Sequence, residues 1–164
     1  MAGFKFRLQP LLDEKLQKKK EAEDALVARQ KELRAEEERL KELRLHEQSQ
    51  IAKRVRLRGE LLSFPLGGNL SGEEIQRRMQ YLKALGLEVD AARDAVFSQQ
   101  MTIDEAREKL AEAQRNLAEC SREAEVMNKY RAKLQQRWAR DIEQKEALEQ
   151  DEVGNMLYMK RRSQ

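Results

Sequence analysis

The apolar residues between positions 75 and 148 recur at alternating spacings of three and four over most of this stretch. The members of this series are Ile75, Leu82, Leu85, Val89, Ala92, Val96, Ile103, Ala106, Leu110, Ala113, Leu117, Cys120, Ala124, Met127, Leu134, Trp138 and Leu148. A repeat of seven residues fits two turns only if the helix is slightly underwound, so it requires a partner helix wrapped around it. The sequence therefore predicts an all-α coiled coil whose function lies on surfaces and ends rather than in an enclosed pocket.

The composition agrees with long solvated helices. Charged residues make up 38% of the chain and aromatic residues 5%, with 7 Gly and 2 Pro among 164 residues. A layered globule needs more aromatic and β-branched mass than this. Disorder is the alternative for so polar a chain, but a disordered segment has no reason to keep apolar residues in phase over more than seventy positions.

One break interrupts the helical pattern, over residues 63–72. Pro65, Gly67 and Gly68 end a helix that begins near residue 8, so we expect helix one over about 8–62. Ser71 followed by Glu74 predicts a capping box, which starts helix two, expected over about 73–160. A short connection between helices gives antiparallel neighbours. We therefore expect a single coiled-coil domain over residues 1–164, a long antiparallel α-hairpin with an extended C-terminal helix.

The first helix carries a weaker apolar pattern than the second. Its seven-residue step is carried by Leu26, Leu33 and Leu40. The polar residues at positions facing the partner are Lys19, Arg29 and Glu36. Farther along, Ile51, Val55 and Leu62 share a phase displaced by about four residues. This displacement predicts a stutter, a local unwinding of the supercoil.

The two arms are unequal in length. Counted back from the turn, helix one is too short to pair with residues beyond about 130 of helix two. Leu134, Trp138, Ile142 and Leu148 would then be exposed apolar side chains, which monomers in water usually avoid. We expect the C-terminal segment either to fray or to meet another protein.

The sequence offers no chemistry for an enzyme. His46 is the only histidine and lies in a polar run, and Cys120, the only cysteine, falls on the apolar series. No Gly-rich phosphate loop or Cys cluster is present, and the carboxylates are spread along helix surfaces. We therefore expect no catalytic residue, no cofactor and no metal site.

The charge pattern does not favour nucleic acid. Two basic stretches, 53–58 and 160–162, are candidates for contact with an acidic partner. However, 33 basic residues balance 30 acidic ones for a net charge of +3, and there is no aromatic stacking platform. We expect no nucleic-acid partner.

The pattern also argues against membrane insertion. The longest uncharged run, 61–72, is interrupted by Pro65 and is too short to cross a bilayer. The N-terminal residues do not form a signal peptide, because Lys5 and Arg7 interrupt the apolar residues there. These features predict a cytoplasmic protein.

Several segments, taken in order, resemble the flagellar export protein FliJ family. They are the opening Phe4-Lys5-Phe6-Arg7-Leu8-Gln9-Pro10-Leu11-Leu12, the glycine-containing break followed by Tyr81-Leu82-Lys83-Ala84-Leu85, Glu143-Gln144-Lys145, Asp151-Glu152 and Lys160-Arg161-Arg162. The resemblance covers nearly the whole chain. Injectisome stalk proteins of type III secretion share this plan, so the flagellar and injectisome systems both stay open.

The resemblance implies a non-enzymatic component of the type III export apparatus, located in the cytoplasm at the inner membrane. Members of this family look like the central stalk of rotary ATPases, with the terminal end of the hairpin entering the ring of the hexameric export ATPase. The turn end then reaches the cytoplasmic domain of the export gate membrane protein. Chaperones of export substrates are further implied partners.

Two sets of residues follow from the resemblance. The set implied for ATPase binding is Phe6, Leu8, Leu12, Trp138, Asp151, Glu152, Met156 and Tyr158. The set implied for binding the export gate is Arg54, Arg58, Tyr81, Leu82 and Leu85.

Two other classes of function stay open on the sequence. One is a generic structural coiled coil that dimerises through its second helix. The other is an adaptor that binds export cargo chaperones without acting on the ATPase.

Overall fold

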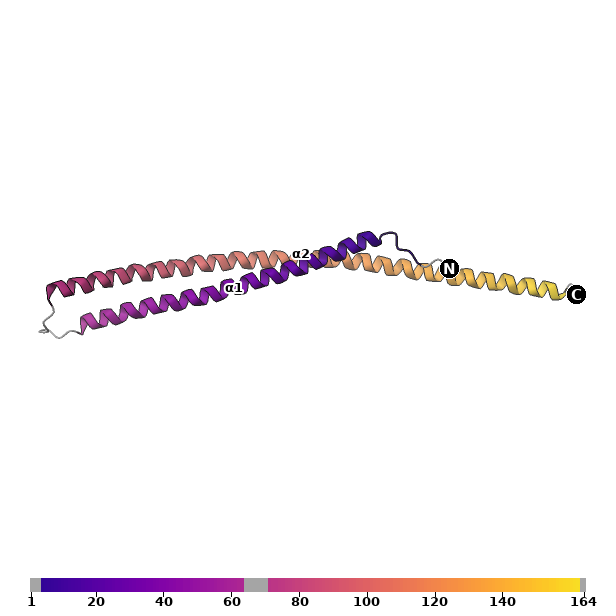
Figure 1. Cartoon of the computed structure of the whole chain (residues 1–164). Helices are drawn as coiled ribbons and strands as arrows, with labels where there is room; N and C mark the ends of the chain where they lie inside the picture. Colours follow the sequence, from indigo (N-terminus) through magenta and orange to yellow (C-terminus); the bar gives the residue numbers. More distant parts are fainter. Residues whose placement is uncertain (1–3, 64–70, 163–164) are drawn as a thin grey trace. The chain divides into compact units, whose positions relative to one another are not determined.

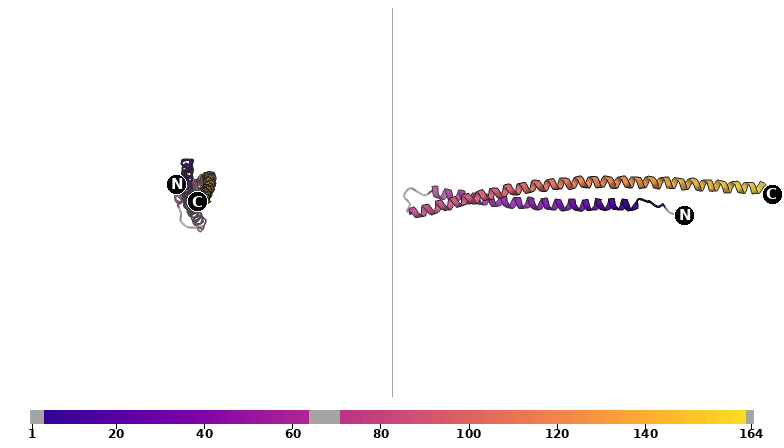
Figure 2. Two further views of the ribbon diagram at one scale, coloured as in Figure 1. Left: turned by 90° about the vertical axis from the view of Figure 1, so that its right-hand side faces the viewer. Right: turned by 90° about the horizontal axis from the view of Figure 1, so that it is seen from above.

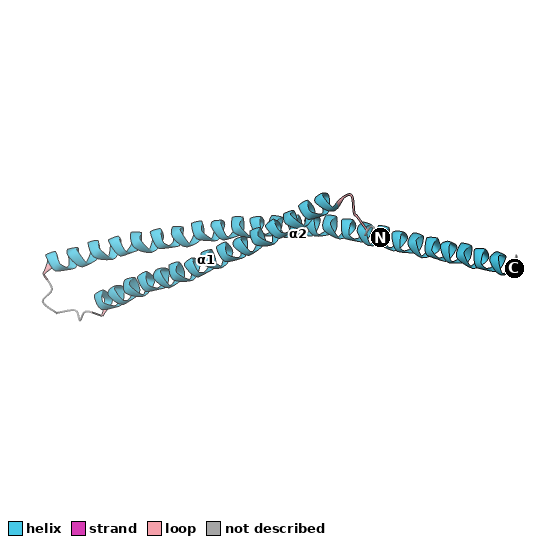
Figure 3. Cartoon of the chain, turned by 45° about the vertical axis from the view of Figure 1, so that its right-hand side comes forward, coloured by secondary structure: helices cyan, strands magenta, loops and turns pink. Residues whose placement is uncertain are grey.

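The computed structural model describes residues 4–63 and 71–162 and contains two long helices in these ranges. Helix α1 spans Gln9–Leu62 and helix α2 spans Gly72–Arg162. Within the described ranges all other residues are in loops, and there is no strand (Figure 3). The fold class is all-α, with two antiparallel helices packed as a hairpin. Most of the expected turn, residues 64–70, lies outside the described residues.

Contacts between the helices gather into two compact units. The central unit comprises Ala25–Gln114, and the terminal unit comprises Met1–Asp24 with Arg115–Gln164. A single coiled-coil domain over residues 1–164 was the expectation from the sequence. Each unit contains one stretch of α1 and one of α2, and each is described separately below.

In the central unit the two helix segments lie side by side and run in opposite directions (Figure 1). Glu47 on α1 pairs with Arg93 at 3.5 Å, and Glu37, ten residues earlier, pairs with Arg107 at 3.6 Å. The partner's number rises as the α1 number falls, which is the mark of an antiparallel pair. Between these ion pairs runs a line of side chains that face the other helix, here called the seam.

The terminal unit pairs the start of α1 with the second half of α2. Leu12 is only 1% exposed, and Ala22 and Ala124 are also buried. Lys15 bridges the two helices through a 2.7 Å ion pair with Glu123. The seam in this unit is therefore as narrow as in the central one, with charged side chains closing its edge.

The apolar series predicted for the second helix forms most of the α2 seam. Buried members are Leu85, Val89, Ala92, Ile103 and Ala124. Half-buried members are Leu82, Val96, Ala106, Leu110, Ala113, Leu117, Cys120, Met127 and Leu134. The two ends of the series, Ile75 and Leu148, are exposed instead. Apolar periodicity thus identified the inward face of α2 wherever α1 lies against it.

The stutter predicted in the first helix is wrong. Of the displaced series, Ile51 is half-buried, but Val55 and Leu62 are 64% and 76% exposed, whereas Leu57 and Leu61 in the original register are half-buried. The seam therefore keeps its original register to the end of α1. Between Leu43 and Leu57 the buried seam position is taken by a polar residue, Gln50. The apolar series that suggested a shift lies beside the seam, because α1 places polar residues on the seam itself.

A polar contact crosses the seam of the central unit. The side-chain amide of Gln99, itself buried, donates hydrogen bonds to the Glu36 carboxylate and, at 3.1 Å, to the Glu36 backbone carbonyl. Glu36, Lys19 and Arg29 are half-buried, as their predicted seam positions require. Gln99 was absent from the predicted seam because only apolar residues were counted.

Half of the predicted capping box forms at the start of α2. The backbone N–H of Glu74 donates to the Ser71 hydroxyl at 3.3 Å, so Ser71 caps the helix. The Glu74 carboxylate accepts a hydrogen bond from Arg78 at 3.1 Å, one turn along the same helix. Its expected return bond to Ser71 is thus replaced by an ion pair on the α2 surface.

Ion pairs within each helix support the exposed faces. Lys18 donates a hydrogen bond to the Glu14 carboxylate at 2.7 Å, which together with the lysine's charge holds the pKa of Glu14 below its usual value. Lys129 lowers the pKa of Glu125 in the same way. These contacts favour the helical state of segments whose outer faces meet water.

The buried amide of Gln50 yields a prediction for stability. Its side-chain oxygen has no hydrogen-bond partner, and a buried unpaired acceptor costs about 1–3 kcal/mol. We expect Gln50→Leu to raise the free energy of unfolding by about 1–2 kcal/mol, measured by urea denaturation. Gln48→Leu, at an exposed neighbouring position, should change it little, and a loss of stability in Gln50→Leu would contradict the burial argument.

Candidate functional site

A short segment before α1, residues Phe4–Leu8, packs on α2 in the terminal unit and is here called the clasp. The rings of Phe4 and Trp138 lie 5.9 Å apart at 55°, and those of Phe6 and Tyr130 lie 6.2 Å apart at 59°. Both are favourable tilted geometries for aromatic pairs. Figure 1 and the right view of Figure 2 both draw the segment close to the second half of α2. The clasp therefore joins two stretches separated by more than 120 positions in sequence.

The clasp consists of residues 4–6, which have no regular secondary structure, and a turn at residues 7–8 that leads into α1. Phe4 and Phe6 are two positions apart, the spacing that brings side chains to one side of an extended chain. The N–H of Gln9 donates to the Phe6 carbonyl at 3.1 Å, and that of Leu12 to the Leu8 carbonyl at 3.0 Å. Pro10 lies in the first turn of α1, where its missing N–H costs nothing. The chain thus passes directly from clasp to helix.

The clasp corrects the expectation that helix two has no partner beyond residue 130. Residues of the clasp and of α2 up to Asp141 line one shared groove. Leu134 and Ile142 are half-buried, and Trp138 is 37% exposed. The segment without such cover is shorter and begins at Glu143.

From Glu143 to Arg162 every residue of α2 is exposed, and this segment is here called the C-terminal arm. Its large apolar side chains are between 55% and 72% exposed. They are Leu148, Val153, Met156, Leu157, Tyr158 and Met159. Val153, Met156 and Leu157 have the three- and four-residue spacing that places them on one helix face. The arm therefore presents an apolar face to water, which typically marks a surface that binds another molecule.

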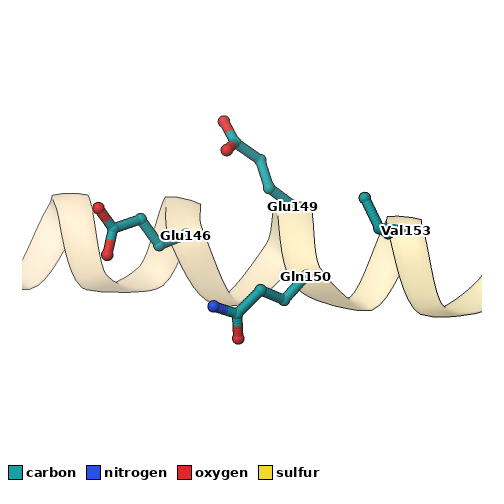
Figure 4. A pocket seen from close by; sticks show the side chains of 4 residues that line it. All are labelled: Glu146, Glu149, Gln150 and Val153. Atoms are coloured by element: carbon teal, nitrogen blue, oxygen red, sulfur yellow. The ribbon is translucent and has the colours of Figure 1, made fainter. Parts of the chain in front are cut away.

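The hollows on the arm are shallow. Figure 4 shows Glu146, Glu149, Gln150 and Val153 around one of them, all on the same helix, with Glu149 and Gln150 pointing in opposite directions. Side chains of one helix cannot enclose a small molecule. This part of the arm is a surface on which acidic and apolar groups adjoin.

The residues that the resemblance implied for ATPase binding divide into two groups. Leu8, Trp138, Asp151, Glu152, Met156 and Tyr158 are exposed in the terminal unit. Phe6 and Leu12 are buried against α2 and offer almost no surface to a partner. The exposed members extend from the clasp along the C-terminal arm.

The residues implied for export-gate binding also divide by exposure. Arg54, Arg58 and Tyr81 are exposed, Leu82 is half-buried, and Leu85 is only 2% exposed, so that it belongs to the seam of the central unit. The structure places all five in the central unit, near the ends of the two helices that flank residues 63–71.

Arg54 lies directly over the backbone of α2. A Cβ atom built on the buried Gly86 would stand 3.6 Å from the guanidinium carbon of Arg54, in ordinary contact. Arg54 also borders an open groove with the apolar side chains of Ile75, Met79 and Leu82. A cationic group beside an apolar groove is suited to a partner that carries both acidic and apolar side chains.

Sequence reasoning missed the clasp contacts. The sequence placed Phe4 in a family motif and Phe6 also in the set implied for ATPase binding, but it predicted no contact of either ring with Tyr130 or Trp138. The available signal was the alternation of Phe4 and Phe6 together with two aromatic residues eight positions apart on the second helix.

Searches of the described residues add two findings. Within 4–63 and 71–162, neither helix is both long and apolar enough to span a membrane. In the same ranges no three His, Cys, Asp or Glu side chains gather where they could hold a metal ion.

Comparisons with known proteins give one family and one solved structure. The profile of the YscO-like protein family matches residues 4–164. The solved structure of CT670 from Chlamydia trachomatis, described as a candidate YscO homolog, is similar with a TM-score of 0.81 and 19% sequence identity. The similarity covers 99% of each chain. No curated protein matches the sequence significantly.

These findings support the coarser part of the resemblance, a YscO-like family, and give no support to its flagellar part. The matching profile describes YscO-like proteins, not the flagellar FliJ proteins that the sequence motifs suggested. At 19% identity the likeness to CT670 shows the fold alone, and that fold is the expected helical hairpin.

The clasp yields a prediction that the single tryptophan can report. Phe4→Ala removes the ring beside Trp138, so we expect Trp138 fluorescence to shift to the red and iodide to quench it more strongly. Phe6→Ala should lower the free energy of unfolding by about 1–3 kcal/mol, because the ring of Phe6 is buried. The control is Phe97→Ala, at an exposed position, and unchanged fluorescence in Phe4→Ala would show that the clasp is not bound in solution.

Proposed function

Because the chain belongs to the YscO-like family of type III secretion components, we propose that it is a non-enzymatic stalk of the export apparatus that binds the hexameric export ATPase through its C-terminal arm. The observation that carries this proposal is the apolar face of the arm. Val153, Met156 and Leu157 are each more than half exposed on a helix that extends past the clasp. Such a helix fits a ring that closes around it and covers this face.

The exposed members of the implied set complete the contact. Met156 and Tyr158 offer large apolar side chains, and Asp151 and Glu152 place two carboxylates beside them. Buried aromatic and methionine side chains are typical anchors of interface cores, whereas charged groups at the rim select partner and orientation. Leu8 and Trp138, at the clasp, would extend the contact toward the paired helices.

Phe6 and Leu12 have a different part in the proposal. Both are buried in the terminal unit, so their contribution to ATPase binding is to hold the clasp and the first turn of α1 on α2. The clasp thereby fixes the point at which α2 continues as a single helix. In this proposal the whole chain, residues 1–164, acts as one coiled-coil domain that couples its two ends.

The second proposed partner is the cytoplasmic domain of the export gate membrane protein. Arg54, Arg58 and Tyr81 are exposed in the central unit, and the groove beside Arg54 supplies apolar surface. Leu82 contributes at the groove, and Leu85 supports it from the seam. A stalk that binds ATPase and gate would act in the cytoplasm at the inner membrane, where it could also meet substrate chaperones.

Steady-state ATP hydrolysis by the purified export ATPase of the same organism tests the ring contact. We expect stoichiometric full-length chain to stimulate hydrolysis, and a chain that ends at Ile142, which keeps the clasp and its aromatic partners, to give none. The double variant Met156→Ala/Tyr158→Ala should weaken binding about tenfold, as expected for anchor residues.

The matched control for this variant is Phe97→Ala/Met101→Ala, which removes an aromatic and a methionine side chain that are also more than half exposed but lie on the central unit. Equal stimulation by the full-length chain and by the chain ending at Ile142 would refute the proposed role of the arm. A complete lack of binding would favour a generic structural coiled coil.

Binding to the purified cytoplasmic domain of the export gate tests the second contact. Arg58→Glu and Tyr81→Ala should each lower the affinity about three- to tenfold, measured by isothermal titration calorimetry. Arg39→Glu makes the same charge change at an exposed position outside the proposed surface and should bind normally. If all three variants bind alike, the gate surface lies elsewhere.

A further inference from the structure

The charges of the C-terminal arm are separated along its length. Residues 143–152 carry five carboxylates and one lysine, a net charge of −4, and residues 153–162 carry three basic side chains and no acidic one, a net charge of +3. The exposed apolar cluster from Val153 to Met159 lies between the acidic segment and the basic end. Along the arm, an acidic segment is therefore followed by an apolar cluster and then by a basic end.

Four residues on one face of the arm are spaced symmetrically, so that their spacing is the same whether it is read from the N-terminal or from the C-terminal side. Glu149, Val153, Met156 and Lys160 are four, three and four residues apart, so they follow one stripe of the helix. In a pair of such helices running in opposite directions, Glu149 of each copy faces Lys160 of the other, and Val153 faces Met156. Apolar side chains then meet in the middle and opposite charges meet at both ends.

We propose that the C-terminal arms of two copies of this chain pair in antiparallel orientation around a two-fold axis that passes between residues 154 and 155. Such an interface is isologous, because the same patch serves both copies. The proposal does not depend on the ATPase contact and can be tested on the purified chain alone. The pairing would also cover the exposed side chains of Val153 and Met156 when no other partner is bound.

Charge favours a second copy over an anionic lipid surface. The basic end, Lys160–Arg162, is attractive to such a surface, but the segment before it, with Glu149, Asp151 and Glu152, is repelled by it. A second copy satisfies both segments at once.

The pairing is expected to be weak and reversible. An overlap of about 15 residues spans roughly 22 Å of helix, shorter than the contact of a standard protein interface. We expect a dissociation constant of about 10–100 µM, which is typical of small transient contacts.

Sedimentation velocity on the full chain, over about 5–500 µM, tests the proposal. We expect the wild-type mass to move from monomer to dimer in this range. Glu149→Lys and Lys160→Glu each place like charges at both ends of the pair, so each variant alone should associate about tenfold more weakly. An equimolar mixture of the two variants restores opposite charges at both ends and should regain the wild-type affinity.

Two controls separate the pairing from general effects of charge. Glu143→Lys makes the same change on the same arm, but residue 143 lies six positions before Glu149 and therefore off the pairing stripe, so association should be unchanged. Met156→Asp should keep the chain monomeric throughout, whereas Met101→Asp, at an exposed position of the central unit, should not.

Three outcomes would overturn the proposal. These are a wild-type chain that stays monomeric at every concentration, a mixture that associates no better than its components, and a monomeric chain that binds anionic vesicles through Val153 and Met156. The last result would assign the arm to a lipid surface.

Discussion

In each of the two units a single line of side chains packs one helix against the other, and the other features of the structure depend on how narrow this line is. Val89, Ile103 and Leu12 are almost fully enclosed, but other side chains on the same stripe, such as Leu110 and Leu117, are only half-buried. Two helices can cover one stripe of each other and no more, so large apolar side chains on the other faces, such as Leu45 and Phe97, stay exposed. The candidate surfaces accordingly lie where α2 extends past the clasp and where the groove beside Arg54 opens.

The narrow seam also explains why α1 can place polar residues on it. Lys15 reaches Glu123 at the edge of the seam, and Gln99 spans it to bond Glu36. A side chain at such a position needs to cross only one layer to find a partner or water, which a thick core would not allow. Gln50 differs, because its side-chain oxygen is buried without a hydrogen-bond partner. The free-energy cost of removing this oxygen from water is therefore not compensated by a new hydrogen bond.

The contrast between the two helices shows how much the sequence can reveal. Apolar spacing identified the α2 seam from Leu82 to Leu134, and Ser71 was recognised as the helix cap. On α1 the same counting identified Leu26, Leu33 and Leu40, but beyond them it failed, because the seam position of Gln50 is polar and apolar residues beside the seam suggested a false stutter. The clasp could not be derived either, since contacts between residues more than 120 positions apart leave no local period. For the candidate surfaces, spacing predicted an exposed C-terminal segment but not that it begins at Glu143.

The clasp sets the length of the arm, and the length of the arm limits what it can bind. With α2 covered as far as Ile142, the arm retains several exposed apolar side chains, and both proposed partners use the stripe of Val153 and Met156. That stripe can contact only one partner at a time. The ring contact and the pairing of two copies would therefore be mutually exclusive, and the free energy of pairing would be subtracted from that of ring binding. Because the expected pairing is weak, a ring that encloses the whole circumference of the helix would displace the second copy.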